Sequence, residues 1–238
     1  MRLPSIEGII RRRLLVNFRV EPEVIGRELP VGMTPKLHEG HAVAGICLIR
    51  LETIRPEGLP LPCGLSSENA AHRIAVTAPD GSDAVFVPRR DSDSWLNQAA
   101  GGRLFPGRQH RARFEIDDDG DAVRLSMRSA DDEVTLQVEG RRADTLPSDS
   151  IFASLDDASR FFESGALGYS STSKPGCYDG MLLETKGWSV EPFAVSEVAS
   201  SYFSDTTRFP EGSVAFDHAL VMRDLQHAWH PVSELRAG

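Results

Sequence analysis

A glutamate and a histidine could carry acid–base chemistry on one predicted strand. From 68 to 77 the pattern alternates, so Glu68 and His72 share a face with Ala70 and Ile74. A carboxylate facing apolar side chains is costly unless it is paired, bound to a ligand or open to water. In a pocket Glu68 could accept or donate a proton with His72 beside it, and both are candidate catalytic residues. Alternatively, Glu68 lies at the exposed end of its strand.

Two basic side chains occupy apolar positions on a second predicted strand. Over 108–116, Arg108 and His110 alternate in phase with Ala112 and Phe114. If the sheet closes, both would point into its interior and could bind a carboxylate or an enolate-like oxygen. The alternatives are an arginine at the rim and a hydrogen-bonded core histidine.

Arg50 and His218 are further candidate ligand-binding residues within apolar segments. Arg50 shares the face of Leu48 in a long apolar segment, so it needs a partner if it is buried. His218 alternates with Phe216 and Leu220 on an apolar face. The alternative to ligand binding is a structural role for this histidine in the core.

The other chemistry-bearing residues form no recognisable metal or nucleotide site. Cys47, Cys63 and Cys177 are far apart in the sequence and are most simply interpreted as reduced, buried or inert thiols. His227 and His230 have i, i+3 spacing but no third ligand in the sequence. Phosphate-binding loops, nucleophile elbows and dinucleotide fingerprints are missing from the sequence. We therefore predict no metal site and no cofactor.

The elements that must position these residues are mostly strands. The strands are predicted over 14–20, 41–54, 68–77, 84–89, 108–116, 122–128, 134–142, 181–185, 189–198 and 214–223. Short helices are expected over 23–29, 94–104 and 155–164, the last with Ser154 as N-cap and Gly165 as C-cap. The strand predicted over 14–20 has one buried face, whereas 41–54 is apolar on both faces, the pattern of a central strand.

These patterns predict an α+β fold with a mainly antiparallel, barrel-like β-sheet and a few short helices. The 238 residues, with 40% hydrophobic and 26% charged residues, are expected to form a single domain over 1–238. No linker or internal repeat interrupts the sequence.

Charge and hydropathy exclude several classes of partner. The net charge of −9 argues against general nucleic-acid binding, and no apolar run is long enough to span a membrane. A cytoplasmic location is the expectation. Arginine supplies 23 of the 26 basic residues, so amine catalysis has few candidates. Arg89 and Arg90 precede Asp91, and surface neutralisation explains this cluster better than substrate binding.

The segment from Glu68 to His110 resembles the active-site half of the acetoacetate decarboxylase-like superfamily. That superfamily has a glutamate strand and then a G-R-E-L helix that leads into F-P-K-K with a Schiff-base lysine. This sequence reads Gly-Gly-Arg-Leu-Phe-Pro-Gly-Arg over 101–108. Gly107 stands at the position of the family's lysine and Arg108 at that of the second lysine. The resemblance therefore implies the scaffold without implying Schiff-base decarboxylation.

Across most of the chain the sequence is similar to the YqjF-like bacterial family of unknown function (DUF2071) in that superfamily. The similar segments are 29–32, 44–51, 55–56, 68–73, Phe86 and 103–106. The resemblance implies a β-barrel-like fold that encloses a small-molecule cavity.

The leading functional hypothesis is a small-molecule-binding barrel protein whose ligand is a small carboxylic or keto acid. Glu68, His72, Arg108 and His110 would line the cavity. A cofactor-free lyase, aldolase or cyclase is the first alternative, and a non-catalytic structural module is the second. Whether the protein is an enzyme stays open, and a homo-oligomer is possible.

Overall fold

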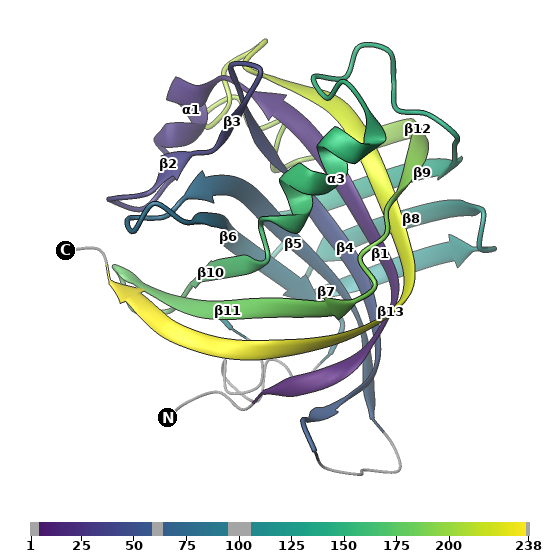
Figure 1. Ribbon diagram of the computed structural model, residues 1–238. Helices are drawn as coiled ribbons and strands as arrows, with labels where there is room; N and C mark the ends of the chain where they lie inside the picture. Colours follow the sequence, from purple (N-terminus) through teal and green to yellow (C-terminus); the bar gives the residue numbers. More distant parts are fainter. Residues whose placement is uncertain (1–4, 59–63, 95–105, 237–238) are drawn as a thin grey trace.

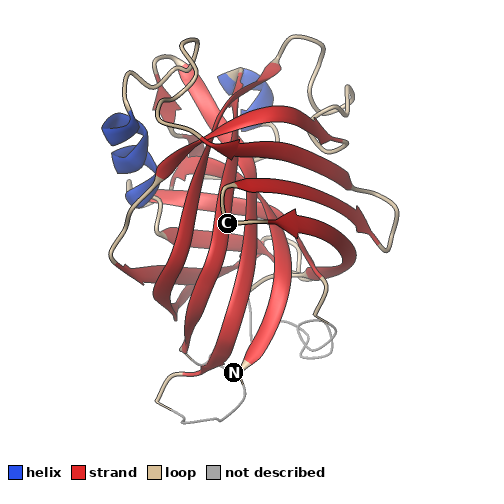
Figure 2. Ribbon diagram, turned by 90° about the vertical axis from the view of Figure 1, so that its right-hand side faces the viewer, coloured by secondary structure: helices blue, strands red, loops and turns tan. Residues whose placement is uncertain are grey.

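Strands make up most of the computed structural model, which describes residues 5–58, 64–94 and 106–236. They join into one mixed sheet of 13 strands (Figures 1 and 2). The strands are β1 (Ile6–Val20), β2 (Thr34–Pro35), β3 (Leu37–His38), β4 (His41–Pro56), β5 (Leu65–Thr77), β6 (Asp83–Ser92), β7 (Gln109–Asp118), β8 (Ala122–Ser129), β9 (Thr135–Arg142), β10 (Leu167–Ser171), β11 (Cys177–Lys186), β12 (Glu191–Ser200) and β13 (Val214–Arg236). The helices are α1 (Pro22–Gly26) and α3 (Leu155–Glu163). The predicted α+β class with a mainly antiparallel, barrel-like sheet is confirmed.

The sheet divides at β6 and again at β13. One edge of β6 pairs with β5, while its other edge pairs with β10 at 85–87 and with β7 at 90–92. Pro88 separates these two segments, and a proline cannot donate a hydrogen bond to a neighbouring strand. Likewise, β13 pairs with β1 on one edge and, on the other, with β12 at 219–221 and with β11 at 226–236.

These two divisions close the described strands into two circuits. The first circuit runs β5, β6, β7, β8, β9, β12, β13, β1, β4 and back to β5. The second circuit runs β6, β10, β11, β13, β1, β4, β5 and back to β6. Strands β13, β1, β4, β5 and β6 belong to both, so these shared strands have the interior of one circuit on each face.

Two apolar clusters cover the opposite faces of the shared strands. In β4, Ile46 and Leu48 pack in the cluster of the first circuit, whereas Cys47 and Ile49 pack in that of the second. Successive side chains of a strand point to opposite faces, so one strand serves both clusters. The prediction that 41–54 is a central strand is confirmed.

The same arrangement corrects the prediction for β1. The sequence indicated one buried face, but Leu15 and Asn17 on the other face are 1% and 0% exposed. In β5, Arg73 also lies on the face that looked polar, and it is 5% exposed. Polar residues in an alternating pattern therefore do not mark a solvent face here, because a second circuit covers them.

Helix α3 lies over the face of the shared strands that belongs to the second circuit (Figure 1). It begins after Ser154, whose hydroxyl accepts a hydrogen bond from the backbone N–H of Asp157 at 3.2 Å, as the sequence predicts. Its C-cap is Ser164 in a right-handed conformation, so the prediction of Gly165 was wrong. Phe161 and Phe162 attach the helix to the second cluster.

Several other elements differ from those expected. The strand β10 lies in a stretch expected to be a loop, and β13 continues to Arg236 rather than ending at 223. The pairs β6–β7 and β6–β10 are parallel within an otherwise antiparallel sheet. The helix predicted over 94–104 falls almost wholly outside the described residues, as does Cys63. Among the described helices, none is long and apolar enough to cross a membrane.

A candidate anion-binding cavity

A cavity lies between α3 and the wall of the second circuit. It has about 1170 Å³ of space outside atoms, the solvent at its mouth included. Apolar side chains make up much of its wall, among them Leu15, Ile49, Val87, Phe161 and Leu183. Such a wall suits the hydrocarbon part of a small molecule.

Three arginines from three shared strands line this cavity. Arg13 comes from β1, Arg73 from β5 and Arg90 from β6. No ion pair joins any of them to a carboxylate in the described part of the chain. A guanidinium in such a place commonly has an anion as its partner, because an unpaired charge is costly to bury.

The contacts of these arginines leave part of their hydrogen-bonding capacity unused. Arg73 donates from Nη2 to Asn17 Oδ1, and its buried Nε has no partner. Arg90 donates from Nε and Nη2 to Ser170 Oγ at 3.1 and 3.0 Å. Arg13 donates from Nε to Cys47 Sγ at 3.2 Å, and its Nη1 has no partner.

Burial lowers the pKa of two of these arginines, Arg73 and Arg90, but leaves it well above neutral pH. It lowers the pKa of Arg73 to about 10, an effect that Arg13 adds to and Cys47 opposes. Burial lowers the pKa of Arg90 to about 10 as well. Both arginines therefore stay protonated at neutral pH. Asp91 also lines the cavity, but it pairs with Arg89 at 2.9 Å, so the three arginines leave an excess of positive charge at the wall.

A buried chain of hydrogen bonds orients Arg73. Asn17 accepts from Arg73 at Oδ1, and its Nδ2 lies 3.0 Å from His218 Nε2. His218 Nδ1 lies 2.6 Å from the carboxylate of Asp217. The directions agree if His218 is neutral with its proton on Nδ1, because Nε2 then accepts from Asn17.

Asp217 closes this chain on the side away from the cavity. Burial alone would raise its pKa, but hydrogen bonds from His218, the Ile151 backbone and Ser150 lower the pKa of Asp217 to about 2. Burial lowers the pKa of His218 despite that carboxylate. The ionised Asp217 and neutral His218 therefore fix the hydrogen-bond direction that presents Arg73 to the cavity.

Lys36 is the one lysine among the described lining residues. Its Nζ donates to Asp83 Oδ2 at 2.7 Å and to Ser164 Oγ at 2.8 Å, and it lies 4.3 Å from the ring centre of Phe161. These contacts suit an ammonium group and join the residue between β2 and β3 to β6 and to the C-cap of α3 beside the cavity.

None of the six site residues predicted from the sequence lines this cavity. Glu68 and His72 do share the predicted face of β5, but that face belongs to the first circuit. Glu68 is 8% exposed rather than at an exposed strand end, and it pairs with Arg12 at 2.7 Å and with Arg50 at 3.8 Å. Burial nevertheless raises the pKa of Glu68 above its usual value.

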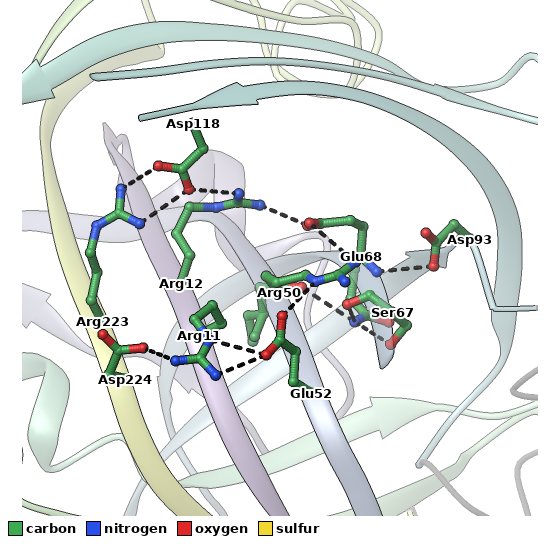
Figure 3. Close-up of polar contacts among 12 residues, drawn as sticks. Arg11, Arg12, Arg50, Glu52, Ser67, Glu68, Asp93, Asp118, Arg223 and Asp224 are labelled. Carbon is green, nitrogen blue, oxygen red and sulfur yellow. Dashed lines mark hydrogen bonds and ion pairs between the residues drawn. The ribbon is translucent and has the colours of Figure 1, made fainter. Parts of the chain in front are cut away.

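Those pairs belong to a larger ionic network on β1, β4, β5, β7 and β13 (Figure 3). Arg12 lies between Glu68 and Asp118, and Arg223 binds the other side of Asp118 at 2.7 Å. Arg50 reaches Glu68, so it has the partner that the sequence analysis required. With their charges matched within the protein, these groups suit a structural role better than ligand binding.

His72 is a core residue of the first circuit. Its ring packs against Tyr202 with centroids 4.3 Å apart and planes tilted by 34°, and neither nitrogen has a partner in the described residues. Complete burial lowers the pKa of His72 to about 3, so the ring is neutral at ordinary pH.

His218 lies on the second-circuit face, but Phe216 does not share that face. A bulge at Asp217 shifts the register between β1 and β13, so Phe18 pairs with Phe216 and Asn17 with His218. His218 consequently contacts Phe152 and belongs to the hydrogen-bond chain behind the cavity. The bulge breaks the alternation on which the sequence prediction relied.

Arg108 and Gly107 lie where β6, β7 and β10 meet. Arg108 is exposed and precedes β7, so it does not point into a cavity as expected. Gly107 has φ of 76°, and a Cβ there would lie 2.6 Å from Ser170 Cβ and 2.8 Å from Ser171 O. The position that matches the family's lysine therefore has no room for a side chain.

His110 belongs to a polar cluster outside the cavity. Its Nδ1 lies 2.8 Å from Asp131, and the donor atoms of His110, Asp131 and Glu133 lie within 4.8 Å of one another. Arg89 binds Asp91, Asp131 and Glu133, with distances of 2.6 to 2.9 Å. The Arg89 guanidinium thus supplies the positive charge that a metal ion would otherwise bring to these carboxylates. Arg89 and Asp91 neutralise each other as predicted, but they are buried.

Sequence reasoning missed Arg13, Arg73 and Arg90. Alternation placed Arg73 on a polar face, and Arg90 looked like part of a neutralised surface pair. One signal was available: the strand 41–54 is apolar on both faces, so its neighbours must also be buried on both faces. An arginine on either face of such a neighbour is a candidate for a buried site.

Comparisons with known proteins agree with this fold. The model of the DUF2071 family, described as uncharacterized conserved proteins, matches residues 10–210. No curated protein sequence matches the chain.

Solved structures with similar folds are acetoacetate decarboxylase-like. Acetoacetate decarboxylase from Legionella pneumophila has a TM-score of 0.61 and 13% identity, with 98% of this chain and 88% of that chain covered. An acetoacetate decarboxylase-like enzyme from Sphingomonas wittichii RW1 has a TM-score of 0.58 and 11% identity, with 100% and 94% covered. The enduracididine biosynthesis enzyme MppR, complexed with pyruvate, has a TM-score of 0.60 and 12% identity, with 100% and 91% covered. The chain belongs to the DUF2071 family and has the acetoacetate decarboxylase-like fold.

Proposed function

We propose that this protein binds a small organic acid in the cavity of the second circuit, with the acid group held by Arg13, Arg73 and Arg90. The observation that carries the proposal is that these three guanidiniums face one cavity without a carboxylate partner in the described residues. A bound anion would offset the cost of burying Arg73 and would supply the partly buried Arg13 and Arg90 with an opposite charge.

The rest of the wall supports a small ligand with an apolar part. The apolar side chains near the arginines would contact its hydrocarbon portion, whereas the guanidiniums would fix its orientation. The pyruvate complex of MppR, a protein of similar fold, agrees with this ligand class. Schiff-base chemistry at position 107 is not part of the proposal, because Gly107 has neither an amine nor room for one.

Titration calorimetry with propionate, pyruvate and the neutral analogue propionamide tests this proposal. We expect the acids to bind and to raise the melting temperature, and the amide to do neither. Replacement of one cavity arginine, Arg90→Met, should weaken acid binding at least about tenfold, because a charged hydrogen-bond donor is lost. Arg124→Met is the matched control, since Arg124 is an exposed arginine on β8 whose ion-pair partner among the described residues is Glu139.

The stability of the free variant separates a binding role from a structural one. We expect the unfolding free energy of Arg90→Met not to fall, because the cost of burying the guanidinium disappears with it. A large loss of stability in the free protein would identify Arg90 as structural. Equal affinity of wild type and Arg90→Met for both acids would contradict the proposed site.

The cytoplasmic location and the possible homo-oligomer stay predictions.

A further inference from the structure

Cys47 brings a nucleophilic atom to the wall of the anion-binding cavity. It lies on β4, is 4% exposed, and its Sγ accepts a hydrogen bond from Arg13 Nε at 3.2 Å. Among the described lining residues, Lys36 is the other amine or thiol, and Asp83 and Ser164 already hold its Nζ. The thiol packs in the second apolar cluster, and it is the nucleophile of the described lining that no carboxylate or hydroxyl holds.

A second observation points to a ligand beside this sulfur. Arg73 is 5% exposed, lines the same cavity and has a buried Nε without a partner. The Nη1 atom of Arg13, whose Nε contacts the sulfur, is also without one. Burial lowers the pKa of both Arg73 and Arg90 and the interaction with Cys47 opposes this lowering, so the sulfur lies within electrostatic reach of both guanidiniums. An acid group held by these arginines would place its neighbouring carbon near the sulfur.

We infer that Cys47 adds reversibly to the carbonyl carbon of a 2-oxo acid bound in the cavity. A bond forms between Sγ and C2 of the acid, the π bond of the C2 carbonyl breaks, and the thiol proton moves to the carbonyl oxygen. The product is a thiohemiketal, and nothing is oxidised or reduced. This inference deepens the proposed function and rests on it.

The surrounding charges favour such an addition. Arg13 holds the sulfur by its hydrogen bond, and a charged donor complements negative charge on that sulfur. Arg73 and Arg90 would hold the acid group and stabilise the negative charge that develops on the carbonyl oxygen. Binding of the acid beside the thiol also replaces an encounter in solution by a reaction within one complex. A carbonyl next to the acid group is the electrophile that this arrangement reaches, which is why the class is 2-oxo acids.

Carbon NMR with [2-¹³C]pyruvate tests the adduct. In the wild-type protein we expect a bound signal in the region of tetrahedral carbons, in addition to the ketone signal of free pyruvate. Cys47→Ser should lack it because a hydroxyl is a far weaker nucleophile, whereas Cys177→Ser should keep it. Wild-type protein saturated with pyruvate and without a tetrahedral signal would overturn the inference.

Propionate distinguishes failure of the adduct from failure of the cavity, because it has the acid group but no carbonyl. We expect Cys47→Ser to lose about tenfold more affinity for pyruvate than for propionate. If both acids bind without a tetrahedral signal, only the adduct is wrong. If neither acid binds, the proposed function fails and the adduct fails with it.

Alkylation gives an independent readout of the same sulfur. Iodoacetate and iodoacetamide each form a bond to Sγ with loss of iodide, and the first carries the charge that the arginines would attract. We expect iodoacetate to label the Cys47 peptide faster than iodoacetamide does, and this preference to disappear in Arg73→Met. The Cys177 peptide is the internal control, since Cys177 lies outside the cavity lining. A faster reaction of Cys47 with the neutral reagent would contradict the arrangement.

Discussion

Neighbouring residues on β5 show how burial on opposite faces leads to different chemistry. His72 faces the packed interior of the first circuit, where burial keeps it neutral. Arg73 faces the cavity of the second circuit, where it stays charged and has a free Nε. Of the polar residues that the sequence placed in a pocket, Glu68 is paired within the protein, His72 is neutral and Arg108 is exposed. The unpaired charge lies on the other face.

His72 should make stability depend on pH. Its pKa is about 3 in the folded protein and about 6.5 when unfolded, so the unfolded state binds one more proton between these values. Stability should therefore fall as pH drops from about 6.5 towards about 3, by up to about 1.4 kcal/mol per pH unit from this group. Between pH 4 and 6 the unfolding free energy of His72→Leu, measured with urea, should depend on pH less steeply than that of the wild type. The difference should correspond to about one proton.

His41→Leu is the control for that measurement, because His41 is exposed at the start of β4. Its slope should match the wild type. An unchanged slope in His72→Leu would show that His72 is protonated in the folded state.

Gly107 should tolerate substitution poorly. Gly107→Ala places a Cβ 2.6 Å from Ser170 and imposes a positive φ on a non-glycine residue. Gly120→Ala is the matched control, since Gly120 has φ of 97° but no atom within 4 Å of a Cβ there. We expect thermal or urea unfolding to show a loss about 1 kcal/mol or more larger for Gly107→Ala than for Gly120→Ala. Equal losses of stability in the two variants would show that Ser170 and Ser171 move aside at little cost.

At the scale of elements, α3 closes the cavity and is attached at several points. His38 on β3 pairs with Asp157 at 3.2 Å, and Trp188 donates to Ser159 at 2.9 Å. Lys36 joins Ser164 at the other end. These contacts arise from residues far apart in the sequence, so the position of the helix over the cavity depends on the closed second circuit.

Loss of the N-cap should weaken α3 locally. Ser154→Ala removes the acceptor for the Asp157 backbone N–H and should cost about 1 kcal/mol. Amide hydrogen exchange should then quicken within 155–163 more than in β8 or β9. Ser196→Ala on β12, an exposed serine, is the control and should change neither stability nor exchange in α3. Unchanged exchange in Ser154→Ala would mean that tertiary contacts alone hold the first turn.

At the scale of the whole molecule, the two circuits share five strands. Neither circuit can open without exposing a face of β13, β1, β4, β5 and β6. We therefore propose that residues 1–238 form a single domain. The described strands show no place where a domain boundary could fall.

A single domain should unfold in one cooperative transition. Tryptophan fluorescence includes Trp188 and Trp229, which pack against the second cluster, whereas far-UV circular dichroism reports all strands. The two probes should give the same urea midpoint. Different midpoints would show that the second circuit opens independently of the first.

Much of the fold follows from local patterns in the sequence. Alternation and turn residues predict β7, β8 and β9, and the helix around 155–163 follows from its N-cap. The apolar character of both faces of 41–54 predicts a central strand, which the structure confirms. These features depend on residues close together in the chain, so local physical chemistry determines them.

The tertiary structure alone decided which faces are packed and which one lines the cavity. The division of the sheet at β6 and β13 joins segments distant in sequence, and a bulge at Asp217 moves His218 to the other face from Phe216. Alternation assigns a residue to one of two faces but not to a particular interior. The sequence by itself therefore determined most of the long strands, the central strand that is buried on both faces and the absence of a lysine at 107. The closing of two circuits decided that Arg13, Arg73, Arg90 and Cys47 meet in one cavity, because only long-range strand pairing brings their faces together.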